Sequence, residues 1–157
     1  MSDVAEMTVI GLPIPQGSLR ALVTPQGKVN TPQGDQRLAR YRADIRTEGA
    51  KAMRDRRLTL MAWAVSVQVT FVLPRPQSHF LPVNSRRDAA ELRPGAPVYP
   101  MGMPDLDKLC RSVLDALTGI VFADDAQVIS LYAAKVYAEE PVFPGLTKLR
   151  ITGGNGP

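Results

Sequence analysis

The sequence contains only one cysteine, Cys110, and only one histidine, His79. One cysteine cannot form an internal disulfide, and these two residues cannot make an ordinary zinc site of Cys and His ligands. Any metal ion bound by this chain would therefore be held by oxygen atoms. No segment approaches the ~20 consecutive apolar residues that span a bilayer, and residues 1–6 lack the basic start and apolar stretch of a secretion signal. These absences predict a cytoplasmic protein with no membrane-spanning segment.

The chain has 157 residues, of which 45% are hydrophobic. This length can bury one core but is short for two ordinary domains, so we expect a single domain over residues 1–157. The formal net charge of +4 is unevenly distributed: residues 20–57 hold ten Lys or Arg against four acidic residues, and the remainder holds nine against eleven. A basic segment of this kind suits a polyanion such as nucleic acid, although a solvated basic helix would have the same composition.

Hydrophobic periodicity predicts four strands, one hairpin and two helices. The strands are expected over residues 4–10, 63–73, 127–137 and 146–152, and the alternation of apolar side chains is clearest from Trp63 to Leu73. The segments 21–23 and 28–30 predict a hairpin around Pro25. A basic amphipathic helix is expected over about 33–57, and a second helix begins at or near Asp105 and stops at Thr118-Gly119.

Residues 74–104 contain seven of the fourteen prolines and show little periodicity. Long segments of this kind inside compact domains are usually functional or disordered. We therefore expect a mobile loop that carries arginines toward a ligand: Arg75, Arg86, Arg87 and Arg93. A flexible polar tail is expected over residues 153–157.

Four aspartates frame the second helix: Asp105 and Asp107 at its start, and Asp124 and Asp125 just past its end. Hydrolysis of a phosphodiester by metal ions needs several carboxylates that converge on one or two Mg²⁺ ions. Residues two apart on a regular helix point in nearly opposite directions, but an N-cap residue is extended, so the side chain of Asp105 can approach that of Asp107. An acidic turn between a helix and a strand remains the alternative for the second pair.

Arg111 lies four residues after Asp107 and four before Asp115, on one polar stripe of the expected helix. Arg111 could contact the scissile phosphate, or the three residues could form ordinary i,i+4 ion pairs on a surface helix. Cys110 falls on the apolar face, where a core position is expected rather than a nucleophile.

Taken together, these motifs resemble the RusA family of Holliday junction resolvases, particularly its phage and actinobacterial branch. The resemblance covers residues from about 8 to 137. It rests on the segments Gly11-Leu12-Pro13-Ile14-Pro15-Gln16-Gly17-Ser18, Pro104-Asp105-Leu106-Asp107-Lys108-Leu109 with Arg111, Leu114-Asp115-Ala116-Leu117-Thr118-Gly119, and Asp124-Asp125-Ala126-Gln127-Val128 with Lys135.

The resemblance implies a homodimeric α+β nuclease, a two-layer sandwich of a mixed β-sheet with helices packed on it, that acts in a bacterial or phage-infected cell. Such an enzyme uses Mg²⁺ or Mn²⁺ to cut four-way DNA junctions symmetrically in recombination and repair. The catalytic residues carried over are Asp105, Asp107, Asp125 and Arg111, and the metal ligands are Asp105, Asp107, Asp124 and Asp125. Family members commonly have Asn at the position of Lys108 and Lys at that of Arg111, so this chain departs from the family at both. Arginine retains the positive charge but cannot donate a proton near neutral pH.

Lysines and arginines of the basic segment, the loop and the acidic motif are expected to bind backbone phosphates. They are Arg20, Lys28, Arg37, Arg40, Arg42, Arg46, Arg86, Arg87 and Lys108. Three other functions remain open. A nuclease for other branched DNA would share every residue, a non-catalytic junction-binding protein would use the acids only as caps and turns, and a glycosyltransferase is disfavoured by the short chain without a nucleotide-binding βαβ unit.

Overall fold

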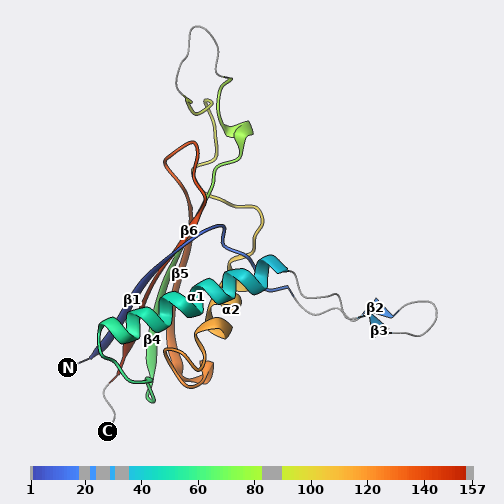
Figure 1. The fold of residues 1–157 in the computed structure, drawn as a ribbon. Coiled ribbons are helices and arrows are strands. Elements are labelled where there is room, and N and C mark those ends of the chain that lie inside the picture. Colours follow the sequence, from blue (N-terminus) through green and yellow to red (C-terminus); the bar gives the residue numbers. More distant parts are fainter. Residues whose placement is uncertain (1, 18–21, 24–28, 31–35, 83–89, 155–157) are drawn as a thin grey trace.

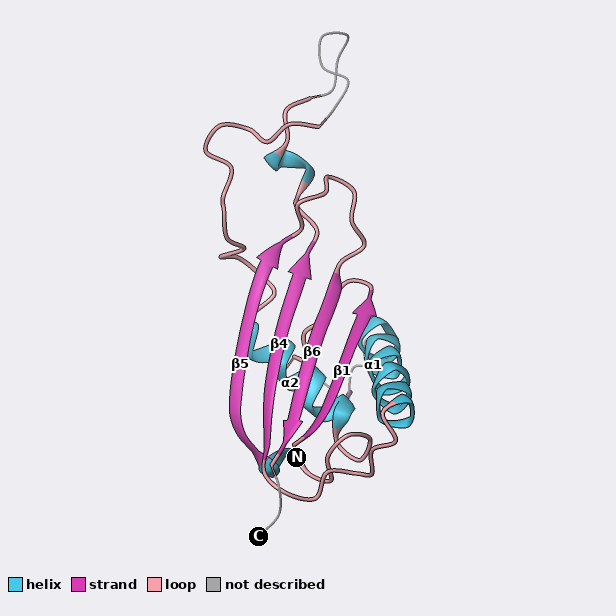
Figure 2. Cartoon of the chain, turned by 90° about the vertical axis from the view of Figure 1, so that its left-hand side faces the viewer, coloured by secondary structure: helices cyan, strands magenta, loops and turns pink. Residues whose placement is uncertain are grey.

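A four-stranded mixed β-sheet forms one layer of the molecule (Figures 1 and 2). The computed structural model describes residues 2–17, 22–23, 29–30, 36–82 and 90–154. The strands are β1 (Asp3–Ile10), β4 (Val65–Leu73), β5 (Val128–Tyr137) and β6 (Leu146–Gly153), in the order β1-β6-β4-β5. Strand β6 is antiparallel to both β1 and β4, whereas β4 and β5 are parallel. The edge strands of the sheet are therefore β1 and β5.

Two helices, α1 (Gln36–Asp55) and α2 (Leu106–Leu117), form the second layer. In Figure 2 the sheet faces the viewer, α2 lies behind it, and α1 lies along its β1 side. The core is made where the apolar faces of the helices and the sheet meet, and Ile45, Leu109 and Phe71 are fully buried there. This arrangement confirms the expected α+β sandwich with a mixed sheet. None of the described helices is long and apolar enough to cross a membrane.

Strand β4 confirms the predicted alternation of buried side chains, but it begins two residues later than predicted. Every second residue from Val65 to Leu73 is buried against the helices. Trp63 was expected to begin the strand, but β4 begins at Val65 and Trp63 is 53% exposed. The Trp63 carbonyl accepts a hydrogen bond from the Gln127 side chain at 2.7 Å instead of pairing with a neighbouring strand. The predicted flexible tail, residues 153–157, is wrong in its first two residues. Gly153 is the last residue of β6, and the Gly154 N–H donates to the Ala64 carbonyl at 2.8 Å.

The basic helix is confirmed as α1, with Tyr41, Ile45 and Met53 among its buried residues. It ends at Asp55, because Arg57 adopts a positive φ of 54° and the Leu58 N–H returns to the Met53 carbonyl at 2.8 Å. The expected hairpin is present as an antiparallel pair, β2 (Leu22–Val23) with β3 (Val29–Asn30). Its turn around Pro25 and the expected helix start at 33–35 lie outside the described residues.

The Pro-rich segment projects beyond the ends of β4 and β5 as an arm (Figures 1 and 2). Antiparallel backbone hydrogen bonds tie its two sides together, from Leu81 N–H to the Glu91 carbonyl and from Arg93 N–H to the His79 carbonyl. Arg75 donates to the Pro97 carbonyl at 2.8 Å, and Arg93 donates through Nε to the Phe80 carbonyl at 2.9 Å.

The expectation that Arg75 and Arg93 point toward a ligand is therefore corrected: both brace the arm, since its prolines lack the N–H groups that would otherwise tie its backbone together. Arg86 and Arg87 lie outside the described residues.

Candidate active site

The start of α2 has the geometry that the sequence predicts. Asp105 is the N-cap residue, with an extended backbone (φ −68°, ψ 137°), and Asp107 lies in the first turn. No side-chain capping hydrogen bond is formed by Asp105. Its carboxylate instead accepts a hydrogen bond from Lys108 Nζ at 3.3 Å. The Asp105 carboxylate is therefore not engaged in capping the helix.

Lys108 lies between the two carboxylates of the Asp-x-Asp motif. Its Nζ is 3.3 Å from Asp105 Oδ2 and 3.9 Å from Asp107 Oδ2. One cation can therefore be reached by both carboxylates, although the two residues are only two positions apart. Asp107 is 80% exposed, so its carboxylate is free to turn toward an incoming ion.

The two residues of the second acidic pair, Asp124 and Asp125, differ in their hydrogen bonds. Asp124 Oδ1 accepts from the Ala126 N–H at 2.8 Å, and Gln127 Oε1 accepts from the Asp124 N–H at 2.7 Å. This reciprocal capping box begins a short 3₁₀ helix, Asp125–Gln127. Both residues are exposed, but the Asp124 carboxylate is engaged in this capping box.

A cleft of about 550 Å³ lies between α2 and the neighbouring end of β5. It brings Asp107 and Arg111 together with Asp125, whereas Asp105 and Asp124 do not line it. The lining residues are Leu106, Asp107, Cys110, Arg111, Leu114, Asp115, Asp125, Leu131 and Ala133. Its floor is apolar and its acidic and basic groups stand around it, which is the usual make-up of a ligand site.

The cleft suits a hard divalent cation by the chemistry of its donors, since carboxylate oxygens are the ligands that Mg²⁺ takes in proteins. Asp105 and Asp107 already converge on one ammonium group, and Asp125 faces the same cleft as Asp107. Within the described residues, however, no three His, Cys, Asp or Glu side chains are gathered as a ready metal site.

Arg111 does not form the ion pairs that would make it an ordinary surface residue. Among the described residues, neither Asp107 nor Asp115 pairs with its guanidinium, and its side chain is exposed at the cleft. Asp115 Oδ2 accepts instead from Gln16 Nε2 at 2.6 Å. The alternative of an i,i+4 ion-pair stripe is thus not found.

Gln16 is a site residue that sequence reasoning missed. Besides contacting Asp115, it donates its backbone N–H to the Lys108 carbonyl at 3.0 Å, so the segment after β1 is fastened along α2 beside the cleft. The only signal for this contact was the place of Gln16 within the Gly11–Ser18 stretch that carries part of the family resemblance.

Lys135 is a second residue whose role was not anticipated. It is half-buried on β5, and its Nζ donates to the Gly102 carbonyl at 2.6 Å and the Pro104 carbonyl at 2.9 Å. These bonds fix the chain immediately before Asp105. The arm therefore returns to α2 at a set point on the sheet.

Cys110 is buried, as expected for a core residue. Burial, and secondarily the charge of Asp107, raises the pKa of its thiol above the ordinary value. The thiol therefore stays protonated near neutral pH, which agrees with a packing role rather than a nucleophilic one.

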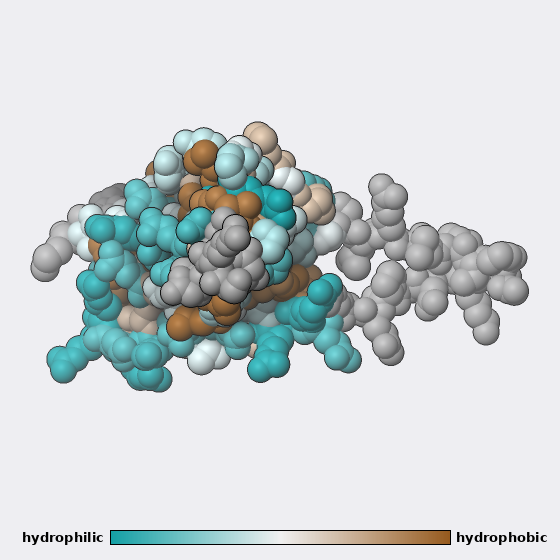
Figure 3. All heavy atoms as spheres, turned by 90° about the horizontal axis from the view of Figure 1, so that it is seen from above, coloured by the Kyte–Doolittle hydropathy of each residue, from teal (hydrophilic) through white to brown (hydrophobic). Residues whose placement is uncertain are grey.

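The expected phosphate-binding residues of α1 lie on its outer side. Arg37, Arg40 and Arg46 are exposed and Arg42 is half-buried. Figure 3, viewed from the arm end, shows hydrophilic side chains along the margin of the molecule where α1 lies. Arg20 and Lys28 lie outside the described residues.

Comparisons with known proteins identify the family. Residues 13–144 match the family model described as endodeoxyribonuclease RusA. The chain is also 31% identical over 141 residues to the uncharacterized protein YqaN of Bacillus subtilis (strain 168), an alignment that spans 88% of this chain and 92% of YqaN. The family match covers most of the chain and confirms the resemblance drawn from the acidic motif. The chain belongs to the RusA family of endodeoxyribonucleases, hydrolases that cut DNA and resolve Holliday junctions.

Proposed function

We propose that this protein is a Mg²⁺-dependent endonuclease that resolves four-way DNA junctions by symmetric hydrolysis in the cytoplasm, with Asp105, Asp107 and Asp125 as its essential carboxylates. The observation that carries the proposal is the cleft between α2 and β5, where Asp107, Arg111 and Asp125 stand together. These residues come from a helix start and a turn about twenty positions apart in the chain. Carboxylates and a cationic side chain around one cleft are the groups that metal-assisted phosphodiester hydrolysis uses.

Asp105, Asp107 and Asp125 would hold Mg²⁺, and Mn²⁺ would substitute because it accepts the same oxygen ligands. A bound divalent ion activates a water molecule and neutralises negative charge on the attacked phosphate. Asp124 is the weaker candidate of the second pair, since its Oδ1 accepts the Ala126 N–H and would have to leave that bond. Lys108 would have to leave the two carboxylates as the ion enters.

Arg111 would act on the phosphate by charge alone. Its guanidinium is always protonated, so it cannot transfer a proton near neutral pH, but it offers several N–H donors to phosphate oxygens. Because it is exposed at the cleft and pairs with neither Asp107 nor Asp115, its charge is available to the substrate.

Basic residues outside the cleft would hold the DNA arms by their phosphates. On α1 these are Arg37, Arg40, Arg42 and Arg46, and near the acids Lys108. Arg20, Lys28, Arg86 and Arg87 remain candidates in segments outside the described residues.

The active form would be a homodimer, because a four-way junction has approximate twofold symmetry and two opposed cuts require two sites related by a matching axis. Each subunit would supply one acidic cleft.

The test is cleavage of a synthetic four-way junction by the wild type and Asp107→Asn, with Mg²⁺ or with EDTA, and with junction binding measured in parallel. We expect paired nicks that require Mg²⁺, and a loss of at least a hundredfold in the rate for Asp107→Asn while binding persists, since one carboxylate ligand is removed without a change of shape. Asp115→Asn is the matched control: it lies on the same helix and lines the same cleft, but its carboxylate is held by Gln16.

If Asp107→Asn and Asp115→Asn lose the same amount of cleavage rate, the loss comes from removing any negative charge in the cleft. That result would count against Asp107 as a metal ligand. Junction binding without cleavage by the wild type would favour a non-catalytic junction-binding protein. Flapped and Y-shaped DNA and linear duplex serve as competing substrates, and faster cleavage of any of them would reassign the substrate.

A further inference from the structure

The face of the sheet that points away from the helices is open and polar at its centre. Figure 2 shows this face toward the viewer, with no helix among the described residues drawn across it. Strand register places its side chains in rows. One row runs Glu6, Arg150, Gln68, Tyr132, and the next runs Thr8, Lys148, Thr70, Ala134.

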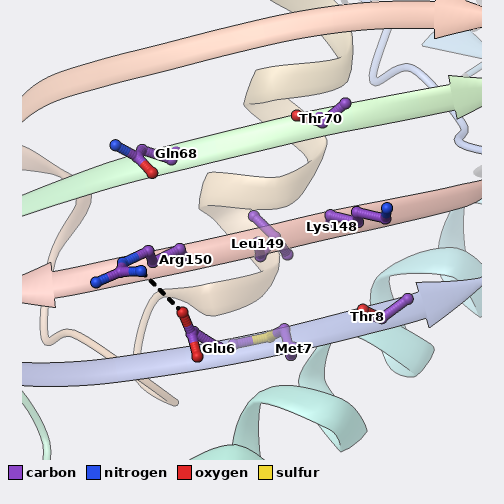
Figure 4. A pocket seen from close by; sticks show the side chains of 8 residues that line it. All are labelled: Glu6, Met7, Thr8, Gln68, Thr70, Lys148, Leu149 and Arg150. Carbon is purple, nitrogen blue, oxygen red and sulfur yellow. Dashed lines mark ion pairs between the residues drawn. The ribbon is translucent and has the colours of Figure 1, made fainter.

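A shallow hollow of about 440 Å³ occupies the middle of these rows (Figure 4). Its polar side chains come from three neighbouring strands: Glu6 and Thr8 from β1, Lys148 and Arg150 from β6, and Gln68 and Thr70 from β4. Lys148 lies beside a hydroxyl on each side, because its register partners are Thr8 and Thr70. Cationic and neutral hydrogen-bond donors are therefore grouped on one surface.

The charge balance of the hollow is positive. Glu6 is its one acidic residue and is already shared by two arginines, at 3.1 Å from Arg150 Nη1 and 3.1 Å from Arg56 Nη2. Lys148 is exposed and forms no ion pair or hydrogen bond with any residue in the described ranges. One ammonium group thus stands unneutralised on the row that also holds the hydroxyls of Thr8 and Thr70.

We propose that this open sheet face is a second DNA-binding surface, on which Lys148, with Thr8 and Thr70 on its own row and Gln68 on the neighbouring row, binds the sugar-phosphate backbone of a junction arm. The inference rests on the proposed junction-resolving function and adds a contact to it. Phosphate is the fitting ligand, since lysine binds it as a point charge and hydroxyl and amide groups complete the donors around its oxygens.

This surface is distinct from the acidic cleft, because alternate residues of β5 point to opposite sides of the sheet. Leu131 and Ala133 line the cleft on the helix side, whereas Tyr132 lies on the open face, at the end of the row that contains Arg150. Tyr132 is 68% exposed and offers an aromatic edge to a strand that crosses the sheet.

A second copy of the chain is a poorer occupant of this face. Twofold contact through it would bring Lys148 and Arg150 toward the same cations of the partner, and the centres of protein interfaces are depleted of charged residues. DNA has the complementary charge.

The test measures binding of a four-way junction in EDTA by the wild type and Lys148→Gln over a range of salt concentrations. Loss of one phosphate contact should weaken binding by roughly tenfold at low salt and reduce the slope of log K against log salt by about 0.9. Lys51→Gln is the control, because Lys51 is an exposed lysine of α1 that is paired with Glu48. We expect it to retain the slope of the wild type. Thermal unfolding confirms that both variants fold.

An unchanged affinity and slope for Lys148→Gln, with normal junction binding by the wild type, would overturn the proposal and leave the proposed function intact. An altered oligomeric state of Lys148→Gln, with an unchanged slope, would assign the face to a second copy and also overturn it. Absence of junction binding by the wild type would remove both the proposed function and this surface.

Discussion

At the scale of single residues, the acidic motif depends on where its first carboxylate stands. Asp105 is outside the helix, with an extended backbone, and Asp107 is inside its first turn. Because of this difference the ammonium group of Lys108 lies within 4 Å of both carboxylates. Lys108 therefore occupies the place in which a divalent cation would compete for the same oxygens.

Lys108→Asn should bind Mn²⁺ more tightly, by on the order of fivefold, because a unit charge about 4 Å away contributes roughly 1 kcal/mol in water. Mn²⁺ affinity is measured by electron paramagnetic resonance on the protein without DNA. Lys51→Asn removes a similar exposed pair, with Glu48 at 3.9 Å, and should leave the affinity unchanged. Weaker binding by Lys108→Asn would show that the lysine assists the ion rather than competes with it.

Tyr41 illustrates a residue whose ionisation is linked to folding. Its hydroxyl is 2.7 Å from Thr147 Oγ1 in the core, and burial raises the pKa of the phenol well above its usual range. Above pH ~10 the unfolded chain loses this proton while the folded chain keeps it, so stability is complete below that pH and falls as pH rises further.

We therefore predict that Tyr41→Phe lowers the free energy of unfolding by about 1–3 kcal/mol at pH 7, because the Thr147 hydroxyl loses its partner. The same variant should reduce the decline in stability above pH ~10. Urea unfolding at a series of pH values measures both effects. Tyr99→Phe, at a side chain that is 69% exposed, should change neither. An undiminished alkaline decline in Tyr41→Phe would assign it to other groups.

At the scale of elements, α1 and α2 meet closely at Gly49. A Cβ atom placed there would lie 3.2 Å from Leu117 Cδ2 and 3.3 Å from Ile120 Cγ2. The fit depends on the absence of a side chain rather than on backbone freedom. This contact couples the basic helix to the helix that begins with the Asp-x-Asp motif.

Gly49→Val should destabilise the protein by about 1–3 kcal/mol, because the added methyl groups overpack the contact. Ala50→Val, at the next and exposed position, should lower stability by no more than about 0.7 kcal/mol through helix propensity alone. Equilibrium unfolding in denaturant compares the two variants. A loss in Gly49→Val no larger than that in Ala50→Val would mean that the contact has room for the side chain, since valine itself has a higher helix propensity than glycine.

The return of the arm to α2 depends on Lys135 of β5. Lys135→Met removes both hydrogen bonds to the Gly102 and Pro104 carbonyls, so Asp105 should lose its set position. We expect the Mg²⁺ concentration for half-maximal cleavage to rise severalfold, and the free energy of unfolding to fall by about 1.5–3 kcal/mol. Mg²⁺ titration of the cleavage rate gives the first value, and Lys51→Met is the control. A fall in stability with no change in Mg²⁺ requirement would limit Lys135 to a structural role.

At the scale of the whole molecule, resolution of a junction requires two cuts on opposite strands. If the active form is a homodimer, sedimentation equilibrium should give twice the mass of one chain at concentrations that support cleavage. Both nicks should then appear within one binding event, which a cruciform plasmid reports as linear rather than nicked product. A monomer that produces only nicked plasmid would contradict the symmetric mechanism.

The features that could be predicted from the sequence are those that lie within one strand or one helix. The alternation in β4, the apolar stripe of α2 and the N-cap place of Asp105 were predicted correctly, since each follows from side-chain spacing within one element. The identity of the acidic residues and the basic character of α1 were likewise readable, because charge and residue type do not depend on the fold.

The tertiary structure decided which of these residues meet. Spacing along the chain did not separate Asp124 from Asp125, and only the family resemblance favoured Asp125. In the structure a capping box engages Asp124, whereas Asp125 lines the cleft. The contacts of Gln16 with Asp115, 99 positions away, and of Lys135 with Pro104 were equally hidden. Trp63 left the predicted strand because its backbone is bonded to Gln127. Such pairings depend on distances between elements, which sheet register and helix packing set and which periodicity along one segment does not contain.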